Sequence, residues 1–180
     1  PLLKERKISL FIKREDLTDK FISGNKWYKL KYNLIEAEKL GYKTLLTFGG
    51  AFSNHIHATA AAGKKYGFKT IGVIRGEEHL PLNPTLIFAQ ENGMLIEYLD
   101  RKSYRDKYDD DLISRLKNKF GDFYLIPEGG SNHLAIKGCA EIIPTIDIKF
   151  DFICSACGTG GTLAGLILGL NSKTFALGFS

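Results

Sequence analysis

The sequence has few cysteines and no long apolar run. Only three of its 180 residues are cysteines, and an odd number argues against the disulfide framework of a secreted protein. No apolar run approaches the length needed to cross a bilayer, and residues 1–7 lack the apolar core of a signal peptide. We therefore expect a soluble, cytoplasmic protein without a membrane partner.

A continuous basic surface pattern is also missing. The net charge of +5 is compatible with a nucleic-acid partner, but basic residues alternate with acidic ones, as in residues 101–119. No basic stripe carries interleaved aromatic residues. We expect no nucleic-acid partner.

The cysteines and histidines are poorly spaced for a metal. Cys154 and Cys157 form a C-x-x-C pair without a second pair at similar spacing, and Cys154 lies inside an expected strand. His55 and His57 would point about 200° apart on a helix. We expect no metal or redox site, buried cysteines and a packing or surface role for His57.

The rest of the sequence has globular composition, with 44% apolar and 25% charged residues. Apolar patterns predict strands at residues 8–12, 44–48, 70–74, 94–99, 123–126, 152–155 and 174–177. Helices are predicted at about 25–40, 53–66, 84–92, 104–120, 132–143 and 161–170, the first capped by Asn25. Such alternation predicts an α/β fold with a mostly parallel sheet covered on both faces.

A glycine-rich corner follows the strand at 152–155 and has the sequence Gly158-Thr159-Gly160-Gly161-Thr162. Glycines at a helix start allow backbone N–H groups to converge on an anion, and the threonine hydroxyls add donors. A P-loop is excluded because no Gly-Lys-Ser/Thr follows, and Leu163 stands where a dinucleotide fingerprint has its third glycine. This pattern indicates a phosphate site; a tight turn without a ligand is the alternative.

Two further glycine corners follow predicted strands. Gly49-Gly50 leads to Ser53, Asn54 and His55 at a helix start, which suits a small carboxylate, although Ser53 could simply cap the helix. The third corner, at 127–132, is interpreted as a capped helix entry rather than as part of the chemistry.

Lys26 lies in the first turn of a predicted helix, where the helix dipole disfavours an ammonium group by roughly 0.3–1 kcal/mol. Such a lysine is either solvated or neutral, and a neutral amine is a nucleophile that forms Schiff bases. Taken alone, Lys26 is better explained as an ordinary surface lysine. A reactive lysine, a phosphate site and a carboxylate site together indicate pyridoxal 5'-phosphate acting on an amino acid.

Several motifs carry a family resemblance that covers nearly the whole chain. They are Lys13-Arg14-Glu15-Asp16-Leu17, Ser23-Gly24-Asn25-Lys26 with Lys29-Leu30, Gly49-Gly50 with Ser53-Asn54-His55, and Cys157 to Thr162. The sequence resembles the 1-aminocyclopropane-1-carboxylate deaminase and D-cysteine desulfhydrase family, which are tryptophan-synthase-β-like, fold-type II enzymes. The resemblance implies a three-layer parallel-sheet fold, with residues 41–145 as a complete small domain. Residues 1–40 and 146–180 would belong to a truncated large domain.

The resemblance also implies roles for individual residues. Lys26 would bind the cofactor covalently and act as the proton-transfer base, and Asn54 would hydrogen-bond the pyridoxal hydroxyl. Ser53, Asn54 and His55 would contact the substrate, with Ser53 also catalytic. The phosphate would lie against Gly158, Thr159, Gly160, Gly161 and Thr162.

The implied reaction is elimination from D-cysteine to give pyruvate, sulfide and ammonia, or ring opening of the cyclopropane substrate to 2-oxobutyrate and ammonia. D-Cysteine is slightly preferred, and the alternative is a non-catalytic relative that binds the cofactor or a phosphate. Family members are longer and have further catalytic residues in the additional part, so we expect the 180-residue chain alone to be nearly inactive. We expect the full-length enzyme to be a homodimer.

Overall fold

A computed structural model describes residues 2–171 and 173–180. Its helices are α1 (Leu2–Glu5), α2 (Asn25–Lys39), α3 (Asn54–Tyr66), α4 (Pro84–Glu91), α5 (Asp110–Phe120), α6 (His133–Ala140) and α7 (Gly161–Gly169). Its strands are β1 (Thr44–Gly49), β2 (Lys69–Arg75), β3 (Met94–Leu99), β4 (Tyr124–Ile126), β5 (Phe152–Ala156) and β6 (Phe175–Phe179). Short 3-10 turns are η1 (Glu15–Leu17), η2 (Ser103–Asp106), η3 (Glu128–Gly130) and η4 (Ile143–Thr145).

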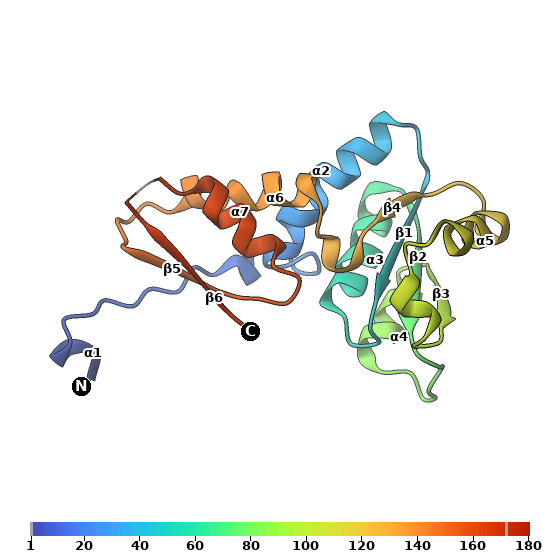
Figure 1. Cartoon of the computed structure of the whole chain (residues 1–180), viewed down its shortest axis with the longest axis horizontal. Helices are drawn as coiled ribbons and strands as arrows, with labels where there is room; N and C mark the ends of the chain where they lie inside the picture. The colour runs from blue at the N-terminus through green and yellow to red at the C-terminus, as the bar shows by residue number, and fades with distance from the viewer. Residues whose placement is uncertain (1, 172) are drawn as a thin grey trace.

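The strands form two parallel sheets. Four strands pair in the order β3-β2-β1-β4, and β5 pairs with β6. In the larger sheet Leu45 of β1 faces Thr70 of β2 and Tyr124 of β4 across the ladder. Figure 1 shows the two sheets at opposite ends of the molecule, with α2 between them. Because parallel strands share a direction, β1 and β4 both end at the edge where their glycine corners begin.

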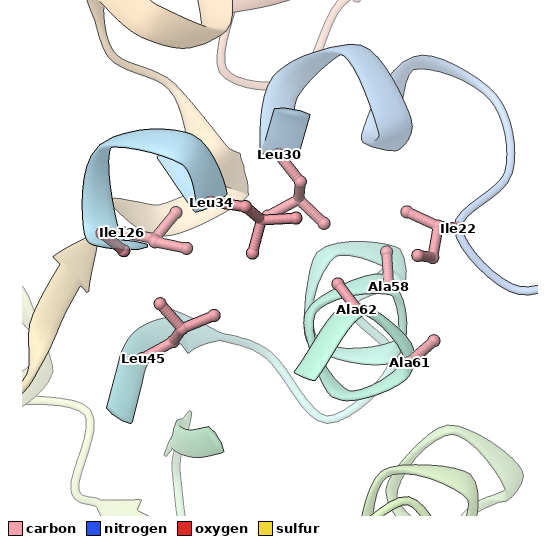
Figure 2. Close-up of a cluster of buried hydrophobic side chains, with 9 residues drawn as sticks. Ile22, Leu30, Leu34, Leu45, Ala58, Ala61, Ala62 and Ile126 are labelled. Atoms are coloured by element: carbon pink, nitrogen blue, oxygen red, sulfur yellow. The ribbon is translucent and has the colours of Figure 1, made fainter. Parts of the chain in front are cut away.

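Helices cover both faces of the four-stranded sheet. On one face, α2, α3 and α4 pack on the apolar side chains of β1 and β2. Figure 2 shows Leu30 and Leu34 of α2 beside Ala58 and Ala62 of α3, with Leu45 nearby. On the other face, α5 buries leucines against a second set, formed by Leu46, Phe48, Ile71 and Val73. This region is the three-layer α/β arrangement that the sequence predicts.

Glycines allow α2, α6 and α7 to pack closely. A Cβ atom at Gly138 of α6 would lie 1.9 Å from the carbonyl oxygen of Tyr28 in α2. A Cβ atom at Gly165 of α7 would lie 2.3 Å from the Cβ atom of Cys139 in α6. The lysine-bearing helix α2 is therefore connected through α6 to α7, the helix that follows β5.

Most predicted elements are confirmed, but some predictions are wrong. Residues 8–12 form no strand and are exposed, because no described strand offers them a hydrogen-bonding partner. The single helix predicted at 104–120 is a 3-10 turn, η2, followed by α5, because Asp109 caps a new helix there. Cys154 is exposed on β5 rather than buried, although Cys139 is in the core.

No helix among the described residues is long and apolar enough to cross a membrane. In the same residues, no group of three or more His, Cys, Asp or Glu side chains is arranged to hold a metal ion.

Candidate functional site

One cavity of about 270 Å³ lies where the two sheet regions meet. Its walls come from the start of α2, the start of α3, the corner after β4 and the corner after β5. The lining residues are Asn25, Lys26, Lys29, Ser53, Asn54, His55, Glu128, Gly129, Ala156, Gly158, Thr159, Gly160, Thr162 and Leu163. The structure thus brings together nearly all of the site residues that the sequence predicts, from segments more than 130 positions apart. Gly161 is the exception, because it packs beneath the cavity against Ser131.

The start of α2 presents Lys26 to this cavity. Gly24 precedes the helix with a φ of +65°, a conformation that glycine adopts readily, and no side chain caps the helix. Asn25 is the first helical residue and not the predicted cap. Its side-chain amide instead donates to the Thr162 hydroxyl oxygen, 2.6 Å away. This bond ties the lysine-bearing turn directly to the start of α7.

Lys29 is a second lysine in the cavity, one turn after Lys26. Its side chain is buried, with 2% of the residue exposed. The ammonium group donates to the Gly129 carbonyl oxygen and the Ser131 hydroxyl, both at 3.0 Å, and to the Thr159 hydroxyl at 3.3 Å. Lys29 therefore connects α2 to both corners that follow β4 and β5.

The two lysines differ in their freedom to react. Burial lowers the pKa of Lys29 to about 8, with help from the charge of Lys26, and burial also lowers the pKa of Lys26. All three ammonium hydrogens of Lys29 have acceptors, whereas among the described residues Lys26 has no side-chain hydrogen bond. A nucleophilic amine needs an available lone pair. Lys26 is therefore the amine placed to react, and Lys29 is placed to supply positive charge.

The corner after β5 is suited to an anion. Gly160 precedes α7 with a φ of +76°, and no side chain caps the first turn of this helix. The backbone N–H groups in the first turn of α7 therefore lie on the cavity side and have no side-chain acceptor. A Cβ atom at Gly158 or Gly160 would meet nothing within 4 Å, so both positions border open space. With the Thr159 and Thr162 hydroxyls as further donors and the positive charge of Lys29 nearby, the corner fits a phosphate group.

The corner after β1 contains Ser53, Asn54 and His55. The Ser53 hydroxyl accepts from the backbone N–H groups of His55 and Ile56. Ser53 therefore caps α3, which is the simpler of the two roles expected for it. Asn54 is exposed and lines the cavity. The His55 side chain is buried and turns toward β1, where its Nε2 lies 2.9 Å from the Thr47 hydroxyl oxygen.

The corner after β4 contributes more than the sequence predicts. Asn132 does cap α6, accepting from the Ala135 backbone N–H. Gly129 and Glu128 line the cavity, however, and the Ser131 hydroxyl bonds to that of Thr159. This corner therefore forms a wall of the site as well as a helix entry.

Sequence reasoning missed Lys29, Ser131 and the side-chain role of Asn25. A usable signal existed for Lys29, since a residue three positions after Lys26 lies on the same face of a helix. No comparable signal existed for Ser131, because its contact with Thr159 depends on how two distant corners pack. His57, as expected, lies outside the cavity and stacks on Phe88 with ring centroids 3.7 Å apart.

Comparison with known proteins gives a consistent answer. Residues 1–177 match the family model described as "Pyridoxal-phosphate dependent enzyme". The chain is 38% identical over 168 residues to a Pyrococcus horikoshii protein provisionally named a 1-aminocyclopropane-1-carboxylate deaminase, covering 90% of this chain and 51% of that protein. It is 34% identical to the Arabidopsis thaliana mitochondrial bifunctional D-cysteine desulfhydrase/1-aminocyclopropane-1-carboxylate deaminase, covering 89% of this chain and 44% of that one.

A solved structure of an ACC deaminase homologue superimposes with a TM-score of 0.82 at 34% identity, covering 98% of this chain and 57% of that one. The chain spans about half the length of the curated relatives it matches. The family match, the parallel α/β fold and the cavity agree that this chain belongs to the pyridoxal-phosphate dependent enzymes.

Proposed function

We propose that this cavity is the cofactor site of a pyridoxal-phosphate enzyme that degrades a small amino acid, either D-cysteine or 1-aminocyclopropane-1-carboxylate. The observation that carries the proposal is the single cavity that joins the Lys26 amine to the uncapped, glycine-rich start of α7. An aldehyde cofactor with a phosphate group needs both at once. The names of the relatives support the two substrates.

The residues present fit this cofactor. Lys26 would attach it covalently, because burial lowers the pKa of this amine. The backbone of residues 158–162 would hold the phosphate, with Lys29 as its counter-charge and Thr162 oriented by Asn25. Asn54 would bond the ring hydroxyl. When bound, the cofactor supplies the electron sink for carbanion chemistry.

The start of α3 would receive the substrate. Its backbone N–H groups and the Ser53 and Asn54 side chains lie beside Lys26 in one cavity, and a helix N-terminus favours a carboxylate. The buried His55 side chain is withdrawn from the substrate and its backbone N–H already donates to Ser53, so we assign His55 no direct substrate contact. With D-cysteine as substrate, the free Lys26 amine would take the proton from the α-carbon; 1-aminocyclopropane-1-carboxylate carries no hydrogen at that carbon.

We propose two domains, with residues 41–145 forming one and residues 1–40 and 146–180 belonging to the other. Separate sheets in the two parts support this division. We also propose that the complete enzyme is a homodimer, and that the 180-residue chain alone turns over little, since its curated relatives are about twice as long.

The direct experiment is cofactor titration followed by parallel assays. Adding pyridoxal 5'-phosphate should produce a visible absorbance band that Lys26→Ala removes while the fold, followed by circular dichroism, persists. The complete protein should release pyruvate and sulfide from D-cysteine or 2-oxobutyrate from 1-aminocyclopropane-1-carboxylate. A band without either product would indicate the non-catalytic binder, and the absence of a band would refute the cofactor proposal.

A further inference from the structure

Gly161 differs from the other glycines of the corner after β5 in what surrounds it. A Cβ atom at Gly158 or Gly160 would meet nothing within 4 Å. A Cβ atom at Gly161 would lie 2.7 Å from the Ser131 hydroxyl oxygen and 3.3 Å from Nζ of Lys29. Gly161 has no positive φ, so its backbone conformation does not require glycine. The missing side chain therefore provides space for two neighbouring polar groups.

The groups that fill this space hold one another. The Lys29 ammonium donates to the Ser131 hydroxyl at 3.0 Å and to the Thr159 hydroxyl at 3.3 Å. The two hydroxyls are also hydrogen-bonded to each other. A methyl group at position 161 would have to displace the Ser131 hydroxyl and push the Lys29 ammonium away from α7.

The position of this ammonium matters because its charge is buried and is not balanced by a carboxylate. Only 2% of Lys29 is exposed, and its hydrogen-bond partners in the described part of the chain are a carbonyl and two hydroxyls. The first turn of α7 lies against the ammonium and carries the positive end of a helix dipole without a side-chain cap. An anion at the start of α7 would compensate both positive groups at once.

We propose that Gly161 is a positioning residue whose missing side chain lets Ser131 hold the Lys29 ammonium against the first turn of α7. The glycine-rich pattern alone suggests that Gly161 touches the phosphate, as its neighbours would. In the structure its Cβ position instead points at Ser131 and Lys29. Gly161 would therefore act on a bound anion through the lysine charge.

The inference rests on the proposed phosphate site, and its test needs neither a Schiff base nor turnover. The probe is pyridoxine 5'-phosphate, which has the ring and the phosphate but an alcohol in place of the aldehyde. Its affinity is measured by fluorescence of Trp27, the single tryptophan, which follows Lys26 in the sequence. Gly161→Ala, Lys29→Met and the double variant are compared with the unmodified protein. Circular dichroism checks that each variant folds, which we expect because only side-chain ends must move.

Gly158→Ala, alone and combined with Lys29→Met, is the matched control. A methyl group there enters the open space beside the cavity and touches neither Ser131 nor Lys29. Its effect on binding should therefore be the same factor with and without the lysine charge.

We expect Gly161→Ala to weaken binding of the probe by roughly threefold to tenfold, the effect of disturbing one interaction with a charged group. In the Lys29→Met background the same substitution should change the affinity by less than about twofold, because no charge remains to be displaced. The affinity ratio between the two backgrounds thus separates an effect on the lysine from an effect on the helix backbone, which would be present in both.

An equal loss from Gly161→Ala in both backgrounds would overturn the inference, since Gly161 would then act on the phosphate or the helix directly. Unchanged affinity in Gly161→Ala, or no binding of the probe by the unmodified protein, would also overturn it. If the expected pattern holds but pyridoxal 5'-phosphate gives no visible band, the cofactor proposal alone fails.

Discussion

The glycine corners after the two sheets look alike in sequence but differ in what surrounds them. In the four-stranded region, a Cβ atom at Gly49 would lie 2.6 Å from Ile56, and one at Gly130 would lie 3.0 Å from His55. After β5, a Cβ atom at Gly158 or Gly160 would meet nothing within 4 Å. The first pair allows the protein to pack against itself, whereas the second borders space that a ligand can fill.

A large loss of stability is expected from a side chain at Gly130. This residue has a φ of +68° and contacts the His55 ring, so Gly130→Ala introduces both backbone strain and overpacking. We expect the free energy of unfolding to fall by about 3 kcal/mol. Urea denaturation measures it, with Gly50→Ala as the control, since the nearest atom to a Cβ there is 3.8 Å away. Equal stability of the two variants would contradict the packing role of Gly130.

A pH-dependent effect on stability is expected from Lys29. The folded chain lowers the pKa of Lys29 from 10.5 to about 8, so the unfolded chain binds more protons between these pH values. The free energy of unfolding should therefore rise across this window, and we expect the rise to exceed that of Lys29→Met by about 1–3 kcal/mol. Denaturation at pH 8 and pH 10 measures the difference, and equal slopes would show that Lys29 has its ordinary pKa.

Lys29 should also affect cofactor binding. Lys29→Met keeps the length of the side chain but removes its charge, so the affinity for pyridoxal phosphate should fall by roughly tenfold to a hundredfold. Lys31→Met is the matched control, because Lys31 pairs with Glu141 outside the cavity. Fluorescence titration gives both affinities. A similar loss in both variants would mean that Lys29 has no specific role.

The smallest expected effect on stability is at Gly158. Because a Cβ atom meets open space there, Gly158→Ala should change the free energy of unfolding by less than about 0.5 kcal/mol. A methyl group in the phosphate space should still weaken pyridoxal phosphate binding, by about tenfold or more. If binding is unaffected, the space beside Gly158 is not where the phosphate lies.

The sequence predicts the strands of the larger sheet well because each combines β-branched and other apolar residues, and glycine corners follow β1 and β4. Residues 8–12 have a similar apolar pattern but form no strand, since strand formation requires a neighbouring strand that local sequence cannot reveal. β5 and β6 do form strands, but Phe152 and Phe175 are more than half exposed, so an apolar sequence does not by itself predict burial.

For the site, Lys26 and the corner after β5 are recognisable from motifs whose chemistry is local, a helix start and a glycine turn. The contacts of Asn25 with Thr162 and of Lys29 with Ser131 join segments more than 100 residues apart. Such contacts depend on helix packing, including the close approach of α6 to α2 at Gly138. Sequence patterns therefore locate the reactive group and the anion site, but not the residues that hold them together.

The most direct test of this account is to identify the lysine that carries the cofactor. The protein is loaded with pyridoxal 5'-phosphate, reduced with borohydride and digested, and the pyridoxyl group is located by mass spectrometry. The account predicts attachment at Lys26, with Lys29 unmodified. Attachment at Lys29, or at a lysine outside the cavity, would contradict it.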